Sequence, residues 1–279
     1  MYECRVLADS LAATNGYRLT TMEVTFPRLV LAEFNTHRMF SRNSASSRAI
    51  PVEKMIQRVL HDPFIPIYWG KNQKGMQAEI ELSPEEQERA EEKWLAARDN
   101  AIVSAQQLLG LGIHKQITNR LLEPFMWHTV IVTATEWQNF FALRTHKDAQ
   151  PEIQRIAEMM KEAYETSHPT LKYFGDYHLP LLEDEDYLRE RGFTEEQLID
   201  ICVGRCARVS YLTHEGKKDP LADIALAKRL AHSGHMSPFE HAATPSFVAG
   251  QSGNFTGWYQ CRKSLPNEAI YAPDSHPLG

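Results

Sequence analysis

The 279-residue sequence contains few cysteines, and they are scattered. The closest pair has i, i+4 spacing and does not form a C-x-x-C motif, so the sequence favours free thiols over a cysteine-based zinc site. The four cysteines are Cys4, Cys202, Cys206 and Cys261.

Long apolar runs are also absent. No stretch reaches the roughly 18 apolar residues needed to cross a bilayer, and the N-terminal MYECRVLADS lacks the basic-then-apolar order of a signal peptide. We therefore expect a cytoplasmic protein with no membrane partner. The net charge of −6 gives no broad basic surface, so we expect no nucleic-acid partner and only a small, locally held polyanion.

The composition is that of a globular protein, with 43% hydrophobic and 24% charged residues. A long helix is predicted over residues 84–109, because Ser83 and Glu86 form a capping box and Gly110 follows as a stop. Further helices are predicted from Pro151, after the capping box of Thr194 and Gln197, and from Asp219 and Pro220 to a stop at Gly234.

Strand-like runs occupy residues 17–26 and 28–34, although the second run is also compatible with the start of a helix. Residues 123–137 predict a strand or turn that leads into a helix through Leu143, starting at Thr133 or Thr135. A polar connection at 175–192 is a candidate sub-domain joint. The predicted class is α+β, with dominant helices and a few strands at the two chain ends.

Three polar clusters are candidates for chemistry. The stretch NTHRMFSRNSASSR at 35–48 mixes arginines with serines and asparagines, which suits a nucleotide monophosphate but is also common in solvated loops. In the second cluster Asn139 and Arg144 lie beside aromatic residues, and a core helix explains those aromatics equally well.

The third cluster is AHSGHMSPFEHAATPSF at 231–247. His235, Glu240 and His241 lack the H-E-x-x-H spacing of a zinc site, and no third ligand is placed, so we expect no metal. The turn SGHMSP is better interpreted as a helix C-cap followed by a ligand-binding surface.

Together these clusters resemble the flavin-dependent thymidylate synthase family, ThyX. THRMFSRNSASSR is similar to the family signature R-H-R followed by N-E-x-S-x-R. RLLEP, NFFALR and DAQPEIQ resemble R-x-x-L-P, N-F-x-x-x-R and A-Q-x-E-I-Q, while CARVSY and SGHMSPFEH resemble A-R-V-S and H-G-H-x-T-P-F-E-H.

The order of these motifs differs from that of the family, in which the A-R-V-S and H-x-T-P-F-E-H segments come first. The chain therefore resembles a circularly permuted member, and residues 241–268 resemble a second, shortened copy of the stretch that precedes HRMFSRN. The resemblance implies one catalytic domain, 1–279, in which helices pack around a small, mainly antiparallel sheet, with a helical insert at about 56–112. It covers roughly 24–55, 113–170 and 203–248.

The resemblance implies a homotetramer that binds FAD between subunits and makes dTMP from dUMP, with methylenetetrahydrofolate and NADPH as co-substrates. It makes Arg144 the arginine that pairs with the pyrimidine and favours ionisation at N3, and Ser46 a positioning residue beside the substrate. The residues implied for the nucleotide are Glu33, Ser46, Ser47, Arg48, Arg120 and Arg144. Those implied for FAD are His37, Arg38, Asn43, Asn139, His235, Ser237 and, from the second copy, Arg262.

The sequence departs from the family at Thr36, which replaces an arginine, at Ser44, which replaces a glutamate, and at Asp148, where histidine is common. Arg262 and Glu268 are candidates to restore the missing groups. Two alternatives stay open: the same chemistry on dCMP or with a hydroxymethyl product, and a non-catalytic flavin- or nucleotide-binding protein.

Overall fold

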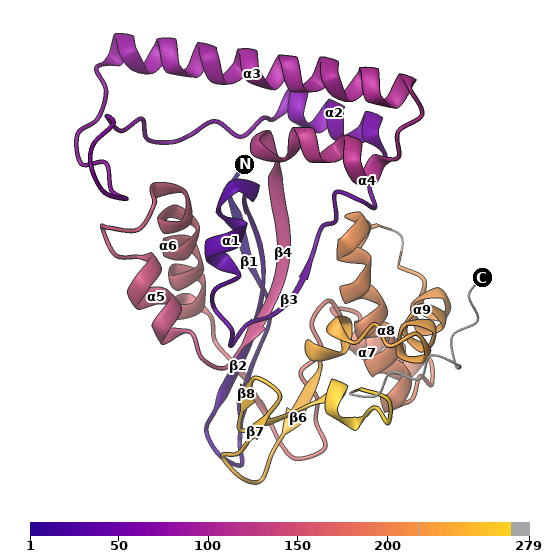
Figure 1. The fold of residues 1–279 in the computed structure, drawn as a ribbon. Helices are drawn as coiled ribbons and strands as arrows, with labels where there is room; N and C mark the ends of the chain where they lie inside the picture. The colour runs from indigo at the N-terminus through magenta and orange to yellow at the C-terminus, as the bar shows by residue number, and fades with distance from the viewer. Residues whose placement is uncertain (217, 269–279) are drawn as a thin grey trace.

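The fold is built on a five-stranded sheet (Figure 1). The structure is a computed structural model and describes residues 1–216 and 218–268, so the predicted domain 1–279 extends beyond the described residues. The strand order is β3-β4-β2-β1-β5, antiparallel throughout except for the parallel pair β1 and β5. The strands are β1 Glu3–Ala12, β2 Arg18–Pro27, β3 Ser41–Ser44, β4 Trp127–Ala134 and β5 Thr170–Lys172.

Alternating side chains divide the sheet into two faces with different cores. On one face Val24, Val130 and Val132 pack with α1 (Leu31–Phe34), α5 (Gln138–Arg144) and α6 (Pro151–Thr166). On the other face Ile131 packs with α7 (Glu185–Glu190), α8 (Glu195–Arg208) and α9 (Pro220–His232). Figure 1 shows the two helical groups on opposite sides of the strands.

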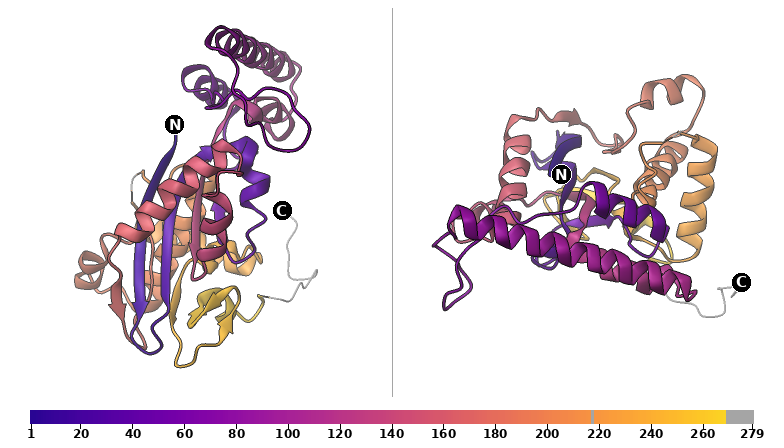
Figure 2. Two further views of the ribbon diagram at one scale, coloured as in Figure 1. Left: turned by 90° about the vertical axis from the view of Figure 1, so that its left-hand side faces the viewer. Right: turned by 90° about the horizontal axis from the view of Figure 1, so that it is seen from above.

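Both ends of the sheet are covered. At one end α3 (Pro84–Gly110) lies across α2 (Val52–His61) and α4 (Lys115–Thr118), as Figure 2 shows from above. Met55, Ile102 and Phe125 share a separate core there. At the other end lie β6 Ala243–Pro245, β7 Gln251–Ser252, β8 Phe255–Thr256 and β9 Trp258–Gln260. The 3-10 helices are η1 Arg28–Val30, η2 Asn119–Phe125, η3 Val209–Tyr211, η4 Ser237–Glu240 and η5 Cys261–Ser264.

Most of the predicted elements are confirmed. The class is α+β with a mainly antiparallel sheet, and all four cysteines are free. The capping boxes at Ser83 and Thr194 form as expected, and Asp219 caps α9. No helix in the described residues combines the length and apolar composition needed to cross a membrane.

Other features of the elements differ from the expectations. Of the two alternatives for residues 28–34, the structure has the helical one, as η1 and α1. The first strand, β1, and the helix α2 were not predicted. The strands are not confined to the chain ends, since β4 lies in the middle of the sequence. Neither Thr133 nor Thr135 caps α5, because both residues are buried in or just beyond β4. The polar connection at 175–192 contains the helix α7.

Gly204 allows α8 and α9 to pack closely. A Cβ added there would lie 2.5 Å from the backbone oxygen of Asp223 and 2.8 Å from its Cα. We expect Gly204→Ala to lower the free energy of unfolding by about 1–3 kcal/mol, the usual cost of overpacking. The matched control is Gly110→Ala at the end of α3, where a Cβ meets no atom within 4 Å, and its stability should stay equal or rise by up to about 1 kcal/mol. Urea unfolding of the two variants checks this, and equal midpoints would contradict it.

Candidate functional site

Arg144, at the end of α5, is held by the segment that follows α1. Its Nε donates to Nε2 of His37 at 2.9 Å, and its Nη2 donates to Oγ1 of Thr36 at 3.1 Å and to the backbone oxygen of Glu33 at 3.3 Å. Three of the predicted residues, Glu33, His37 and Arg144, are therefore in one group, although Arg144 is more than 100 residues from the other two in sequence.

His37 is buried and packs edge-on against Phe140, with ring centroids 4.9 Å apart. Burial, and then the charges of Arg144 and Arg42, lower the pKa of His37 to about 4. The ring is therefore neutral near pH 7, and its Nε2 can accept the proton that Arg144 donates.

Two arginines next to this group lack a carboxylate partner. Neither Arg38 nor Arg42 forms an ion pair with any residue of the described chain, and Arg42 Nη1 donates only to the backbone oxygen of His37, at 3.5 Å. Burial and the charge of Arg38 lower the pKa of Arg42, while the charge of Glu240 opposes this. Two guanidinium groups that repel one another form a favourable place for an anion.

The C-terminal segment reaches the same region through β3. Ser41 Oγ donates to Asn254 Oδ1 at 3.0 Å, and Gln260 Nε2 donates to Ser41 Oγ at 3.2 Å. Glu240 pairs with Arg262, and Arg262 Nε lies 3.2 Å from Glu268. The structure therefore brings Arg262 and Glu268 close to the first polar cluster, although Arg262 is already paired with two carboxylates.

The other residues predicted for FAD differ in their surroundings. Asn43 is buried; its Nδ2 donates to the backbone oxygen of Cys206 at 3.4 Å, and its Oδ1 has no hydrogen-bond partner in the described structure. Asn139 is exposed on α5. Ser237 is exposed at the start of η4, which packs beside β3. His235 is exposed two residues before η4, and its Nδ1 lies 2.8 Å from Ser233 Oγ.

Two of the residues predicted for the nucleotide, Ser47 and Arg120, form a second group around Glu123. Oε1 of Glu123 accepts from Ser47 Oγ at 2.8 Å and from Arg120 Nη1 at 2.7 Å, and lies 3.0 Å from Arg28. Arg48 is exposed and forms no ion pair within the described residues. Ser46 donates its backbone N–H to the oxygen of Ser210 at 3.0 Å.

Sequence reasoning missed three residues that shape this second group. Glu123 and Arg28 hold it through charge, and Asn119 Nδ2 donates to the backbone oxygens of Ser47 at 2.6 Å and Ile50 at 2.9 Å. The motif RLLEP contains Glu123, so its carboxylate could have been noticed. Arg28 and Asn119 carry no comparable signal in the sequence.

No direct polar contact joins the two groups. No hydrogen bond or ion pair in the described structure links Glu33, His37 or Arg144 to Ser47, Arg48 or Arg120. The strand β3 and the residues after it connect the two groups along the sequence. We refer to each group below as a half-site.

The candidate metal ligands of the 231–247 motif contact other side chains. His241 is fully buried with Nδ1 2.7 Å from Thr133 Oγ1, and burial lowers its pKa to about 3. Glu240 pairs with Arg262, and His235 contacts Ser233. These three ligand candidates of the 231–247 motif therefore face different partners.

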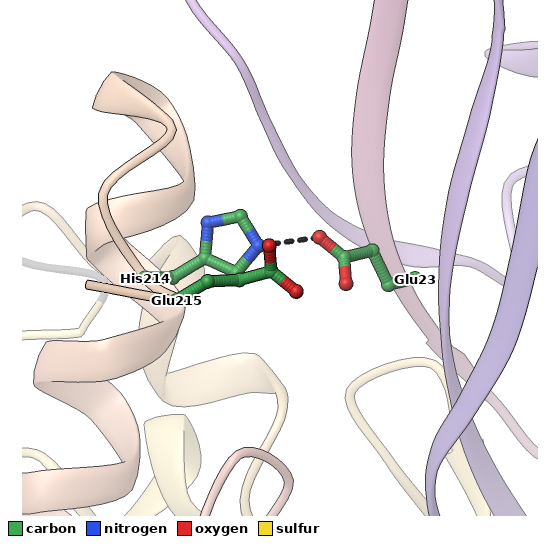
Figure 3. A group of neighbouring side chains, drawn as sticks. All are labelled: Glu23, His214 and Glu215. Atoms are coloured by element: carbon green, nitrogen blue, oxygen red, sulfur yellow. Dashed lines mark hydrogen bonds and ion pairs between the residues drawn. The ribbon is translucent and has the colours of Figure 1, made fainter. Parts of the chain in front are cut away.

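A different carboxylate and histidine group is formed by Glu23, His214 and Glu215 (Figure 3). His214 Nε2 hydrogen-bonds to Glu23, while Arg5 donates to Glu23 from Nε and to Glu215 from Nη2, both at 2.6 Å. Burial would raise the pKa of Glu23, but His214 and Arg5 outweigh it and lower the pKa. Because the guanidinium of Arg5 already pairs with both carboxylates, the group joins the sheet to the segment after η3 through ion pairs and hydrogen bonds.

Comparison with known proteins supplies the family. The family model described as thymidylate synthase complementing protein, Thy1, matches residues 18–170. A flavin-dependent thymidylate synthase of Aquifex aeolicus (strain VF5) is 27% identical over 162 residues, which cover 56% of this chain and 48% of the relative. The chain thus spans about half the length of that relative.

Two solved structures are similar in part. Both are of the UMP/dUMP methylase PolB from Streptomyces cacaoi. The one bound with 5-Br dUMP has a TM-score of 0.45 and 21% identity, covering 53% of this chain and 66% of that one. The one bound with 5-Br UMP has a TM-score of 0.49 and 17% identity, covering 59% and 88%. Because both TM-scores are below 0.5, we draw no functional conclusion from them.

The family match carries more weight than these partial similarities. Residues 18–170 include the Arg144 group and the Glu123 group, with the strands β2, β3 and β4 that position them. Since this match spans more than half of the sequence, the chain belongs to the Thy1 family of thymidylate synthase complementing proteins.

Proposed function

We propose that this chain is a flavin-dependent enzyme that transfers a one-carbon unit from methylenetetrahydrofolate to C5 of dUMP and reduces it with electrons from NADPH, giving dTMP. The observation that carries the proposal is the position of Arg144, fixed by a neutral histidine inside a Thy1 chain. Arginine at that point suits a reaction in which negative charge develops on a pyrimidine ring.

The residues of the first group fit FAD. Arg38 and Arg42 are two neighbouring cations with no carboxylate partner in the described chain, as a diphosphate requires. Asn43 offers a buried amide oxygen without a partner. Bound flavin would supply the hydride, and the protein supplies binding and orientation. We assign the FAD site to His37, Arg38, Asn43, Asn139, His235, Ser237 and Arg262.

Arg144 acts on the pyrimidine in this proposal. His37 and Thr36 fix its Nε and Nη2, while Nη1 makes no hydrogen bond within the described residues. A donor at Nη1 would stabilise the ring with N3 deprotonated and raise electron density at C5. Neutral His37 orients the guanidinium without competing for its charge.

The second group holds the nucleotide in this proposal. Arg48 is exposed and forms no ion pair with the part of the chain that the structure describes, and Arg120 shares Glu123 with Ser47, so both guanidinium groups can contribute N–H donors to a phosphate. Ser46 positions the substrate, since its hydroxyl makes no hydrogen bond to a base within the described residues. Because the two groups are half-sites on one chain, we propose that subunits of a homotetramer combine them.

The same chemistry on dCMP, including a hydroxymethyl product, is the second candidate. Thr36, in the position of a family arginine, places a neutral hydroxyl 3.1 Å from Arg144. An arginine donor matches the unprotonated N3 of cytosine without any ionisation, whereas uracil must first lose its N3 proton. A pocket that hydrogen-bonds one base can reject the other strongly.

The absorption spectrum of the purified protein, reconstituted with FAD, tests the function. We expect a flavin spectrum that anaerobic NADPH bleaches and that methylenetetrahydrofolate restores only together with dUMP. Restoration with dCMP alone would select the second candidate. Bound flavin that no pyrimidine nucleotide reoxidises would instead point to a non-catalytic binding protein.

Arg144 and Arg262 have different tasks in this proposal, and paired variants separate them. Arg144→Ala should lower kcat by about 100-fold or more, the scale of losing one charge-stabilising donor, with FAD affinity nearly unchanged. Arg262→Ala should instead weaken FAD binding, because it frees Glu240 beside Arg42. Flavin titration and steady-state rates measure both effects, and Lys147→Ala, an exposed neighbour of α5, is the control.

The lowered pKa of His37 predicts that the protein binds nucleotide less tightly at acid pH. Its pKa is lowered from 6.5 to about 4 by burial and by Arg144 and Arg42, so the folded state favours the neutral ring. The resulting contribution to the free energy of unfolding is complete above pH 6.5 and is lost as the pH falls toward 4. Nucleotide affinity should be constant between about pH 6.5 and 8 and fall below about pH 5. The variant His37→Gln keeps a hydrogen-bond acceptor and should not show this fall in nucleotide affinity below about pH 5. Calorimetric titrations at several pH values measure the affinity, and the same fall in the variant would contradict the prediction.

A further inference from the structure

A cleft outside both half-sites lies between α2, the sheet and the segment after η3. It consists of two adjoining cavities of about 460 and 500 Å3. The two share the lining residues Glu3, Thr25, Arg58 and Thr129. None of the residues assigned to FAD or to the nucleotide lines either cavity.

The α2 side of the cleft carries two cations without partners. Lys54 and Arg58 are spaced i, i+4, so they lie on one face of the helix. Neither side chain forms a hydrogen bond or an ion pair with residues 1–216 or 218–268. The nearby arginines Arg5 and Arg28 are in contrast paired with carboxylates. Both side chains are exposed to solvent, and partial burial lowers the pKa of Arg58.

The wall beside these cations is apolar and aromatic. Met55, Phe125 and Trp127 line it, and Trp127 Nε1 is buried without a hydrogen-bond partner in the described structure. Thr25 and Thr129 contribute hydroxyls that bond to each other at 3.0 Å. A flat ring can pack on this wall, because aromatic and thioether side chains offer large, polarizable contact surfaces.

Carboxylates line both cavities of the cleft, and most of them are paired. Glu23 and Glu215 line one cavity, where Arg5 pairs with both, while Asp62 lines the other and pairs with the N-terminal amino group. Glu3 lies where the two cavities meet. Within the described residues, no carboxylate forms an ion pair with Lys54 or Arg58, so these two side chains can attract an anion.

We propose that this cleft binds a small aromatic anion, with its carboxylate or phosphate on Lys54 and Arg58 and its ring against Phe125 and Trp127. The cleft adjoins the second half-site, because Thr129 accepts a hydrogen bond from the backbone N–H of Ala45 at 2.9 Å, next to Ser46. The anion has two chemical sources: the benzoyl-glutamate part of a folate, which rests on the proposed function, or a nucleoside monophosphate, which does not.

Calorimetric titration of the full chain with p-aminobenzoyl-glutamate and, separately, with dTMP tests the proposal. We expect one of the two probes to bind at least tenfold more weakly to Arg58→Gln than to the unmodified chain. We expect a similar loss of affinity for Lys54→Gln. The control is Arg89→Gln, an exposed arginine on α3 that lines neither cavity, and it should bind like the unmodified chain.

The two probes distinguish the sources. Weaker binding of p-aminobenzoyl-glutamate to Arg58→Gln identifies the folate part as the ligand, and weaker binding of dTMP identifies a nucleotide. Absence of binding by both probes overturns the proposal. So does binding that is unchanged in both Arg58→Gln and Lys54→Gln, since such a ligand sits elsewhere. The titration needs neither flavin nor turnover, so its failure and the failure of the proposed reaction are separate results.

Discussion

The pairing of β4 with β2 and β3 is the constraint on which the rest of the structure depends. Its register sends Val130 and Val132 into one core and Ile131 into the other, so one strand fixes the position of both helical layers. The same register places β3, and with it the polar residues that follow, at the sheet edge. A shift of this register by one residue would turn the side chains of β4 to the opposite faces of the sheet and move the half-sites away from the helices that position them.

The sequence predicted helices well where local chemistry decides them. Capping boxes at Ser83 and Thr194, and the proline after Asp219, act over a few residues, and each formed where expected. β1 was missed because its residues show no clean alternation and are mostly half-buried, and the strand is stabilised by pairing with β2 and β5, which lie elsewhere in the sequence. Residues 28–34 have strand-like composition that was also compatible with a helix, and they form η1 and α1 directly after Pro27.

For the candidate site, motif resemblance identified the residue types but not their partners. The contacts of Arg144 with His37 and Thr36 were not visible in the sequence, because α5 and the segment after α1 are far apart in the chain and are brought together by the shared core. The carboxylate of Glu123 is visible in the sequence, but its role as a centre of charge depends on Arg28 and Ser47, which come beside it only in the folded chain. The unpaired Lys54 and Arg58 could not be recognised either, since an unmatched charge is defined by what surrounds it in space.

The link between Ser41 and Gln260 has a consequence for how the protein reaches its folded state. The two side chains are 219 residues apart in the sequence and 3.2 Å apart in space. Contacts of such long range form slowly, since the entropy of closing the loop must be overcome before they stabilise anything. During synthesis on a ribosome, the strand bearing Ser41 must wait, with its polar edge uncovered, until the segment carrying Asn254 and Gln260 has emerged.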